Sequence, residues 1–327
     1  SAAKVRRFMD RLVGFRASKF SRSWSLPAMG RVQTPTLGFI VDKEIEREQF
    51  VPQPYFSVYA DAGGLRWNAR FHEKSDAEAW VDDKGKFHAT RTNDAKLAES
   101  ALEAATGGLT LSRVEPGQYK SNPDPPFTTD TLLMKAGSEM NWKPGRTMKV
   151  AGELYNAGHI TYIRTDSSRT SAGARDEVKA FIKETWGQDH LGKGVVGPDV
   201  KGDKANVQDA HEAIRPTRPA VQNIEGISTE QSRLYRLIWS RFAASQMSPS
   251  QYERLSMSAS ASGFEKSFTS TASWRVHRGW EAAFEGIRKE PAISPPSFNA
   301  SVGESLELDS EDVESSNPQL IEDETKP

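Results

Sequence analysis

The sequence predicts a multidomain α+β protein in which a helical domain interrupts a β-rich one. Apolar and polar residues alternate in residues 55–71 and again in residues 251–276, as they do in half-buried strands. Between these stretches, apolar residues recur at helical spacing. A chain of 327 residues is long enough for roughly two or three domains. The simplest arrangement is a helical insertion, with the strands on its two sides pairing across it.

The first fifty residues are expected to be helical and basic. Residues 5–13 place their apolar side chains on one stripe, and Gly14 can end that helix. Residues 35–48 show the same helical spacing. Residues 1–31 contain eight basic side chains and one acidic side chain, with Phe and Trp residues between them. This mixture is typical of a surface that follows phosphates and stacks bases, although the aromatic residues could also be core.

Turn signals divide the β-rich part. The glycine pair 63–64 separates two alternating runs and predicts a hairpin. A helix is expected over residues 95–105 and a strand over residues 109–114. Pro116 and Gly117 are the first of several residues that mark a linker.

Helix start signals mark the inserted part. Residues 128–140 have helical character, and Pro144 suits the first turn of a second helix. Ser171 is expected to open a third helix, and Ser228 with Gln231 forms a capping box for a fourth. Residues 159–164 are expected to be extended. Residues 187–210 are expected to form a glycine-rich loop.

These patterns suggest four parts. We expect a basic helical segment suited to binding nucleic acid, a discontinuous β-rich arch, a helical domain, and an acidic tail or linker to a further portion. In that order they occupy residues 1–50, 51–115 with 251–309, 116–250, and 310–327.

Composition limits the class of protein. The formal net charge of −1 excludes a polyanion binder that works through bulk charge alone, but not one with a local basic surface. The absence of cysteine excludes thiolate catalysis, disulfides and cysteine-ligated metal sites. No apolar run reaches the length of a membrane span, and the first residues lack the apolar stretch of a signal peptide. We therefore expect a cytoplasmic protein with no membrane partner.

The most suggestive residues for chemistry are Tyr162 and Arg164. In an extended segment, side chains two residues apart project to the same face. A phenol beside a guanidinium is a sensible nucleophile for a phosphodiester, because the fixed positive charge favours phenolate and stabilises the transition state. Taken alone, this pattern is more often a packed tyrosine whose hydroxyl is hydrogen-bonded.

Three motifs give the pair its context. They are Gly-Arg-Val-Gln-Thr-Pro at residues 30–35, His-Ile-Thr-Tyr-Ile-Arg-Thr-Asp at residues 159–166, and Gln-Asp-Ala-His-Glu-Ala-Ile-Arg-Pro at residues 208–216. In this order they closely resemble the motifs of the type IA DNA topoisomerases. Pro-Pro-Phe-Thr-Thr at residues 125–129 is similar to a fourth, and residues 27–37 look most like the archaeal branch, that is, an archaeal-like topoisomerase I.

The resemblance implies a role for each motif residue. Tyr162 would attack a backbone phosphate of single-stranded DNA and form a 5′-phosphotyrosyl link, while a second strand passes through an open toroid-type gate. The covalent link conserves the energy of the broken bond, so no ATP is needed. Arg164 would be the second catalytic residue, holding the scissile phosphate. The DNA-binding residues would be Arg31, Gln33, Thr161, Asp166, His211 and Arg215.

The same resemblance implies a part that we do not find here. Members of the family carry a Toprim domain that holds Mg²⁺, and no segment of this sequence has its pattern, so we expect no metal ligand in these residues. His211-Glu212 lacks the second histidine of a zinc peptidase motif, which argues against that class. We expect a central fragment that binds single-stranded or negatively supercoiled DNA in the nucleoid, with the Toprim domain in cis in the longer protein, and that is inactive alone.

Two alternatives remain open at this stage. The chain could be a non-catalytic module that binds single-stranded DNA, or the topoisomerase half of a reverse gyrase. A topoisomerase III is a further possible parent.

Overall fold

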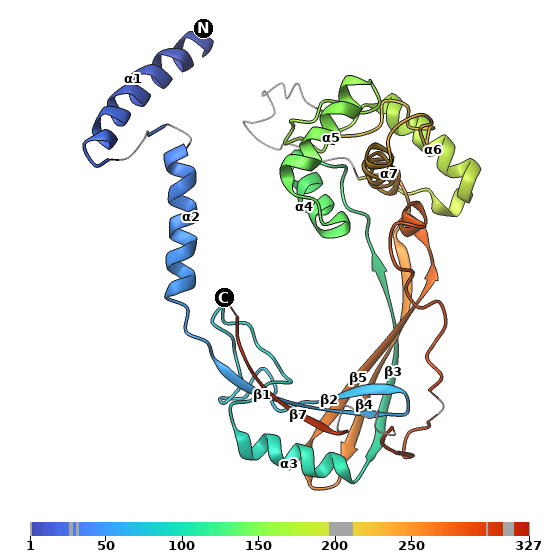
Figure 1. Cartoon of the computed structure of the whole chain (residues 1–327). Coiled ribbons are helices and arrows are strands. Elements are labelled where there is room, and N and C mark those ends of the chain that lie inside the picture. Colours follow the sequence, from blue (N-terminus) through green and yellow to red (C-terminus); the bar gives the residue numbers. More distant parts are fainter. Residues whose placement is uncertain are drawn as a thin grey trace. The chain divides into compact units, whose positions relative to one another are not determined.

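A computed structural model of the chain describes most of its residues (Figure 1). The described residues are 2–25, 29–30, 33–195, 212–298, 300–309 and 317–326. The chain forms two compact units. One holds Ser1–Tyr59, Asn68–Ala104 and Pro318–Pro327, and the other holds Ala60–Trp67 and Ala105–Asn317. Among the described helices, none is long and apolar enough to cross a membrane.

Two helices begin the first unit. Helix α1 spans Ala2–Arg22, so Gly14 does not end it where the sequence predicted. A single glycine inside a helix costs only about 1 kcal/mol relative to alanine, and the residues around it are mostly good helix formers. Helix α2 spans Gln33–Glu48, close to the predicted bounds, and none of its residues is buried. Both helices therefore leave their apolar side chains at the surface.

The predicted hairpin is confirmed. Strands β1 (Pro54–Ala62) and β2 (Leu65–Ala69) are joined by Gly63 and Gly64. Both glycines have positive φ, the conformation that two-residue hairpin turns require. Helix α3 (Ala95–Thr106) follows, also as predicted.

Seven strands form one antiparallel sheet in the order β6-β3-β4-β5-β2-β1-β7. Its long strands are β3 (Leu109–Ser121), β4 (Ser250–Ala261) and β5 (Phe264–His277). Strand β3 precedes the helical insertion and β4 follows it, and the two pair from Thr110–Ser260 to Ser121–Ser250. The predicted pairing across the insertion is therefore correct.

Strand β3 is longer than the sequence predicted. Pro116 and Gly117 lie inside it and not in a linker. Strand β6 (Ser305–Leu306) pairs with β3 only at Leu109 and Thr110. The backbone of Leu111 also bonds to Gly303 and Glu304 on this edge. Among the described residues, the part of β3 that holds Pro116 pairs with β4 alone, so a proline nitrogen that faces away from β4 removes no hydrogen bond between strands. The edge position explains why the proline does not end the strand.

Part of the expected acidic tail is also a strand. Strand β7 (Gln319–Glu324) pairs with β1, and the Tyr55 hydroxyl donates to Oδ2 of Asp323 at 3.1 Å. The acidic side chains of β7 remain exposed to solvent, although its backbone is paired with β1. The division into four parts stays a prediction, and residues 310–316 lie outside the described residues.

The helical insertion has its own core. It contains α4 (Thr129–Met140), α5 (Pro144–Asn156), α6 (Ala172–Trp186) and α7 (Thr229–Ala244), with short 3-10 turns η1 (Gln188–His190) and η3 (Gly279–Phe284). Helix α7 lies at its centre, and ten of its residues are buried. The predicted capping box of Ser228 and Gln231 starts α7. We call these helices with their connecting segments the helical cluster.

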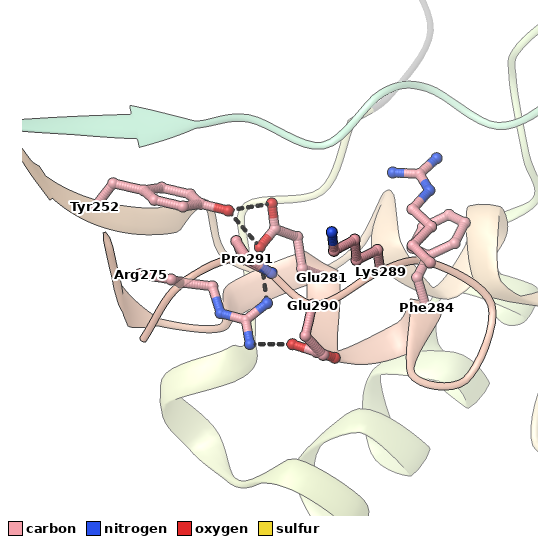
Figure 2. Close-up of a pocket in the computed structure, with 8 residues that line it drawn as sticks. Tyr252, Arg275, Glu281, Phe284, Lys289, Glu290 and Pro291 are labelled. Atoms are coloured by element: carbon pink, nitrogen blue, oxygen red, sulfur yellow. Dashed lines mark hydrogen bonds and ion pairs between the residues drawn. The ribbon is translucent and has the colours of Figure 1, made fainter. Parts of the chain in front are cut away.

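A charged network holds the sheet to the cluster (Figure 2). The Tyr252 hydroxyl is 2.7 Å from both carboxylate oxygens of Glu281, and Arg275 bonds to Glu281 and Glu290. Burial and the bond to Glu281 raise the pKa of Tyr252. Burial would lower the pKa of Arg275, but the two carboxylates raise it. The network is internally satisfied, so it joins β4 and β5 to η3 and the chain that follows.

Candidate active site

The segment with Tyr162 is irregular, but its side chains alternate. Ile160 forms an isolated bridge with Pro216, and residues 161–170 belong to no helix or strand. Tyr162, Arg164 and Asp166 are exposed, whereas the residues between them are half-buried or buried. The predicted period of two therefore holds without a regular strand. It places the phenol and the guanidinium on the accessible side of the segment.

Tyr162 is accessible and rests against another ring. Its side chain is 44 % exposed. The ring of Tyr155, near the end of α5, meets it edge-on, with ring centroids 5.4 Å apart and an interplanar angle of 68°. This contact restricts the direction of the phenol while leaving it open to a substrate.

Arg164 is an available cation. Among the residues that the structure describes, no hydrogen bond or ion pair engages its exposed side chain. A guanidinium can bind two oxygens of a phosphate at once. Arg164 can therefore receive an anionic group beside Tyr162 without first breaking a contact.

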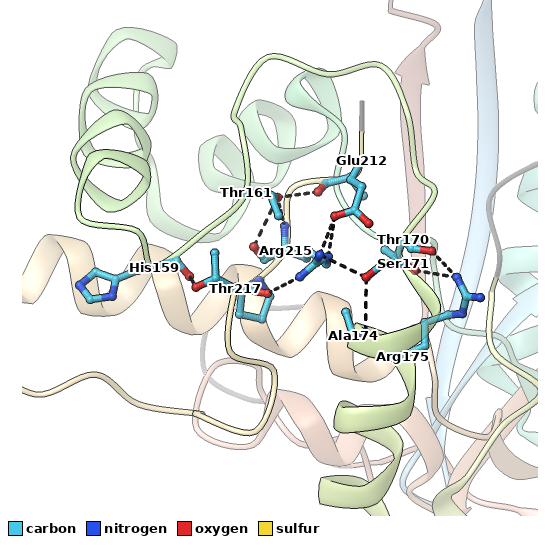
Figure 3. Close-up of polar contacts among 11 residues, drawn as sticks. His159, Thr161, Thr170, Ser171, Ala174, Arg175, Glu212, Arg215 and Thr217 are labelled. Carbon is cyan, nitrogen blue, oxygen red and sulfur yellow. Dashed lines mark hydrogen bonds and ion pairs between the residues drawn. The ribbon is translucent and has the colours of Figure 1, made fainter. Parts of the chain in front are cut away.

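Arg215 is in the opposite situation (Figure 3). Its side chain is 11 % exposed and donates to Glu212, with the shortest distance 2.6 Å. It also donates to the Pro216 carbonyl at 2.9 Å and to the Ser171 hydroxyl at 3.3 Å. In this structure Arg215 ties the segment after residue 212 to the start of α6. Its role as a DNA contact stays a prediction.

Thr161 is also engaged inside the protein. Its hydroxyl donates to the Ala213 carbonyl at 2.7 Å and accepts from the N–H of Arg215 at 3.0 Å. Its own N–H donates to the Arg215 carbonyl at 2.9 Å. Nearby, the Thr217 hydroxyl donates to the Gly158 carbonyl at 2.6 Å. It also lies 3.2 Å from the His159 carbonyl (Figure 3). Two of the sequence motifs thus meet along their backbones, next to Tyr162.

Thr129 is a residue whose importance the sequence did not reveal. It is the first residue of α4, and its hydroxyl contacts the backbone of Ile163 and Thr165 on either side of Arg164. The resemblance of residues 125–129 to a family motif marked this region but gave Thr129 no role. Hydrogen bonds between a side chain and a distant backbone leave no periodic pattern in a sequence, which is why the contact was missed.

The other predicted site residues are placed as follows. Asp166 is exposed on the same segment as Tyr162. Gln33 is the first residue of α2 and belongs to the other unit. Arg31 and His211 lie outside the described residues.

The described residues offer no set of ligands for a divalent cation. The described residues bring together no group of three His, Asp or Glu side chains that could hold a metal ion. The residues described here therefore do not fit the Mg²⁺ that the sequence resemblance implies.

The geometry defines a class of site. It offers an exposed phenol, an available guanidinium two residues away, and a backbone held in place by threonine hydroxyls. Such a site can transfer a phosphoryl group to a tyrosine and stabilise the added charge.

Comparison with known proteins gives the family. The profile of the DNA topoisomerase family matches residues 1–327, so the chain belongs to the type IA DNA topoisomerases. It is 35 % identical over 320 residues to DNA topoisomerase 1 of Vibrio cholerae, covering 94 % of this chain and 34 % of that protein. It is 36 % identical over 274 residues to DNA topoisomerase 1 of Pseudomonas aeruginosa, covering 81 % and 30 %. The chain thus spans about a third of the length of these curated relatives.

A solved structure agrees with the fold. Full-length topoisomerase I from Thermotoga maritima is 29 % identical and superposes with a TM-score of 0.73, covering 100 % of this chain and 50 % of that one. The α+β class with an antiparallel sheet is therefore correct. The named relatives come from bacteria, and the suggested likeness to the archaeal branch stays a prediction.

Proposed function

We propose that this chain carries the cleavage and religation centre of a type IA topoisomerase, with Tyr162 as its nucleophile. The observation that carries the proposal is the accessible pair of Tyr162 and Arg164 on a segment whose backbone is fixed from both sides. The names of the relatives, each a DNA topoisomerase 1, support the same assignment.

The chemical step is a transesterification. The Tyr162 oxygen attacks the phosphorus of a single-stranded DNA backbone and loses its proton. The bond from phosphorus to the 3′ oxygen breaks, and that oxygen leaves as a hydroxyl after taking a proton. The new phosphotyrosyl ester is close in energy to the bond it replaces, so attack by the 3′ hydroxyl reseals the strand without ATP.

Arg164 orients the phosphate in this scheme. Its guanidinium would bind the non-bridging oxygens and stabilise the charge that builds up as the phenol attacks. Because the side chain has no partner among the described residues, binding costs no broken ion pair. Gln33, Arg31 and His211 would add DNA contacts, as the motifs imply.

The wider proposal concerns the complete protein. The β-rich arch and the helical cluster would form parts of an open toroid-type gate that relaxes negative supercoils. The substrate would be single-stranded or negatively supercoiled DNA in the nucleoid, and Mg²⁺ would bind in a Toprim domain in cis. We expect the 327 residues alone to bind single-stranded DNA and to relax supercoiled DNA poorly.

A strand-specific label tests the step. The longest natural polypeptide that contains these residues is incubated with Mg²⁺ and a single-stranded oligonucleotide labelled at one end. A 3′ label should become attached to the protein, and a 5′ label should remain on a shortened product with a free 3′ hydroxyl. Tyr162→Phe should abolish both products, whereas Tyr155→Phe, which keeps the neighbouring ring, should retain them.

Two outcomes would count against Tyr162-dependent cleavage, and a third would count against the expected need for the Toprim portion. An adduct that persists in Tyr162→Phe would assign the nucleophile elsewhere. DNA binding without any adduct, in the presence of the Toprim portion, would favour the non-catalytic binding module. Robust relaxation by the 327 residues alone, lost in Tyr162→Phe, would show that the Toprim portion is dispensable.

A further inference from the structure

The backbone around Arg164 lacks the support of regular structure. Residues 161–170 form no helix or strand, so individual hydrogen bonds must fix their positions. Arg164 nevertheless lies on the accessible side, between a half-buried Ile163 and a buried Thr165. Something specific has to set its direction.

Thr129 supplies that fixation. Its hydroxyl donates toward the Ile163 carbonyl at 2.8 Å and toward the Thr165 carbonyl at 3.0 Å, and it accepts from the N–H of Thr165 at 2.8 Å. Its own N–H donates to the Thr165 carbonyl at 2.9 Å. As the first residue of α4, Thr129 has an N–H with no partner inside the helix, so the bond to Thr165 interrupts nothing.

The geometry bears on Arg164 in particular. The Ile163 carbonyl belongs to the peptide group before Arg164, and the N–H of Thr165 belongs to the peptide group after it. Both groups bond to the same Thr129 oxygen. Since those two peptide planes define φ and ψ of Arg164, one hydroxyl fixes the direction in which the Arg164 side chain leaves the backbone.

Helix capping does not account for this arrangement. Thr128 is the N-cap residue of α4, and it forms a capping box with Thr131. The Thr129 hydroxyl takes no part in that box. The start of α4 therefore has two adjacent threonines, one of which stabilises the helix while the other reaches across to the Arg164 segment.

We propose that Thr129 is a positioning residue for Arg164 in the cleavage reaction. The inference rests on the proposed function, because it assumes that Arg164 binds the scissile phosphate. It predicts a defect in the chemical step and not in DNA affinity, since many phosphate contacts contribute to affinity but the reaction needs one aligned guanidinium.

The test compares Thr129→Val with Thr129→Ser in the longest natural polypeptide. Valine keeps the shape and removes the hydroxyl, whereas serine keeps the hydroxyl. We expect Thr129→Val to slow covalent adduct formation about 10- to 100-fold, as small misplacements of catalytic groups do. Its dissociation constant for single-stranded DNA should change less than about threefold, and Thr129→Ser should retain near-normal rates.

Thr128→Val is the matched control. It removes the neighbouring hydroxyl and weakens the helix cap, but it leaves the bonds around Arg164 intact. It should lower the melting temperature without slowing adduct formation by the folded protein. Equal rate defects in Thr128→Val and Thr129→Val would reduce Thr129 to a structural role and overturn the inference.

A double-mutant cycle identifies the partner. If Thr129 acts through Arg164, adding Thr129→Val to Arg164→Ala should slow adduct formation no further. Independent, multiplying effects would overturn the inference. In all of these assays Tyr162→Phe reports separately on the proposed function, because it should abolish the adduct whatever the outcome at Thr129.

Amide exchange gives a readout that needs no catalysis. Thr129→Val should accelerate exchange at the N–H of Thr165, while Thr128→Val should not. Unchanged exchange at Thr165 in Thr129→Val would contradict the contact itself, even if adduct formation and the role of Tyr162 were established.

Discussion

Two sets of amphipathic helices in this chain differ in whether their apolar faces are buried. Helices α1 and α2 carry apolar stripes, yet residues such as Phe8 and Ile40 are exposed. Helices α4 to α7 show the same periodicity, and their stripes form one core around Trp239 and Leu132. Helical periodicity alone does not distinguish the two sets.

The two sets of helices also differ in how firmly they hold their functional side chains. Helix α1 concentrates basic and aromatic side chains but holds few of them in fixed contacts. The helical cluster fixes its backbone closely enough to present Tyr162 and Arg164 side by side. A surface of the first kind suits general attraction of a polyanion, whereas aligned chemistry needs the second kind.

The largest effect is expected in the core of the cluster. Trp239 is fully buried, and its indole N–H donates to the Pro219 carbonyl at 2.8 Å. Trp239→Ala should cost about 3–5 kcal/mol of unfolding free energy, because it leaves a cavity and an unpaired carbonyl. Urea unfolding followed by circular dichroism measures the loss. A loss below about 1 kcal/mol would show that the cluster packs no better than α1.

A smaller effect is expected at the start of α7. The Ser228 hydroxyl accepts a hydrogen bond from the N–H of Gln231, and the side-chain carbonyl of Gln231 accepts one from the N–H of Ser228. Ser228→Ala should cost about 1 kcal/mol, the usual value for a lost N-cap. The same unfolding experiment tests it. A cost near zero would mean that packing alone holds α7 in place.

This comparison shows how much of the fold the sequence could predict. The Ser228 box, the hairpin glycines and the pairing across the insertion follow from local chemistry and period, and they were predicted correctly. The length of β3 was not, because its tolerance of Pro116 depends on the short partner β6. The end of α1 was missed because one glycine is a weak stop signal.

The site was predictable to a similar depth. The spacing of Tyr162 and Arg164 predicted that both side chains lie on the same accessible face. The family motifs predicted which segments meet around them. The bonds of Arg215 to Ser171 and of Thr129 to the Arg164 segment join residues far apart in sequence. Such contacts form only in the tertiary structure, so no local sequence pattern predicts them.

A pH effect of moderate size is expected where the cluster meets β5. The ring of His190 lies 4.9 Å from that of His277, and its Nδ1 is buried without a hydrogen bond. Burial, and then the charge of His277, lower the pKa of His190 from 6.5. The neutral form is favoured in the folded state, so stability present above pH 6.5 should be lost as the pH falls through the lowered value.

His190→Gln isolates this contribution. As the pH falls through that range, the unfolding free energy of the natural protein should decrease, because a buried ring has to be protonated, whereas that of His190→Gln should stay nearly constant. A parallel loss of stability in both proteins on acidification would place the acid-sensitive group elsewhere in the cluster.

The smallest effect is expected on α1. Phe8 is 68 % exposed, so Phe8→Ala removes little buried surface and adds a better helix former. The unfolding free energy of the 327-residue chain should change by less than about 0.5 kcal/mol. Set beside Trp239→Ala, the result measures directly what burial adds to an amphipathic stripe. A loss near that of Trp239→Ala would mean that the apolar face of α1 is covered in solution, and the contrast between the two sets of helices would disappear.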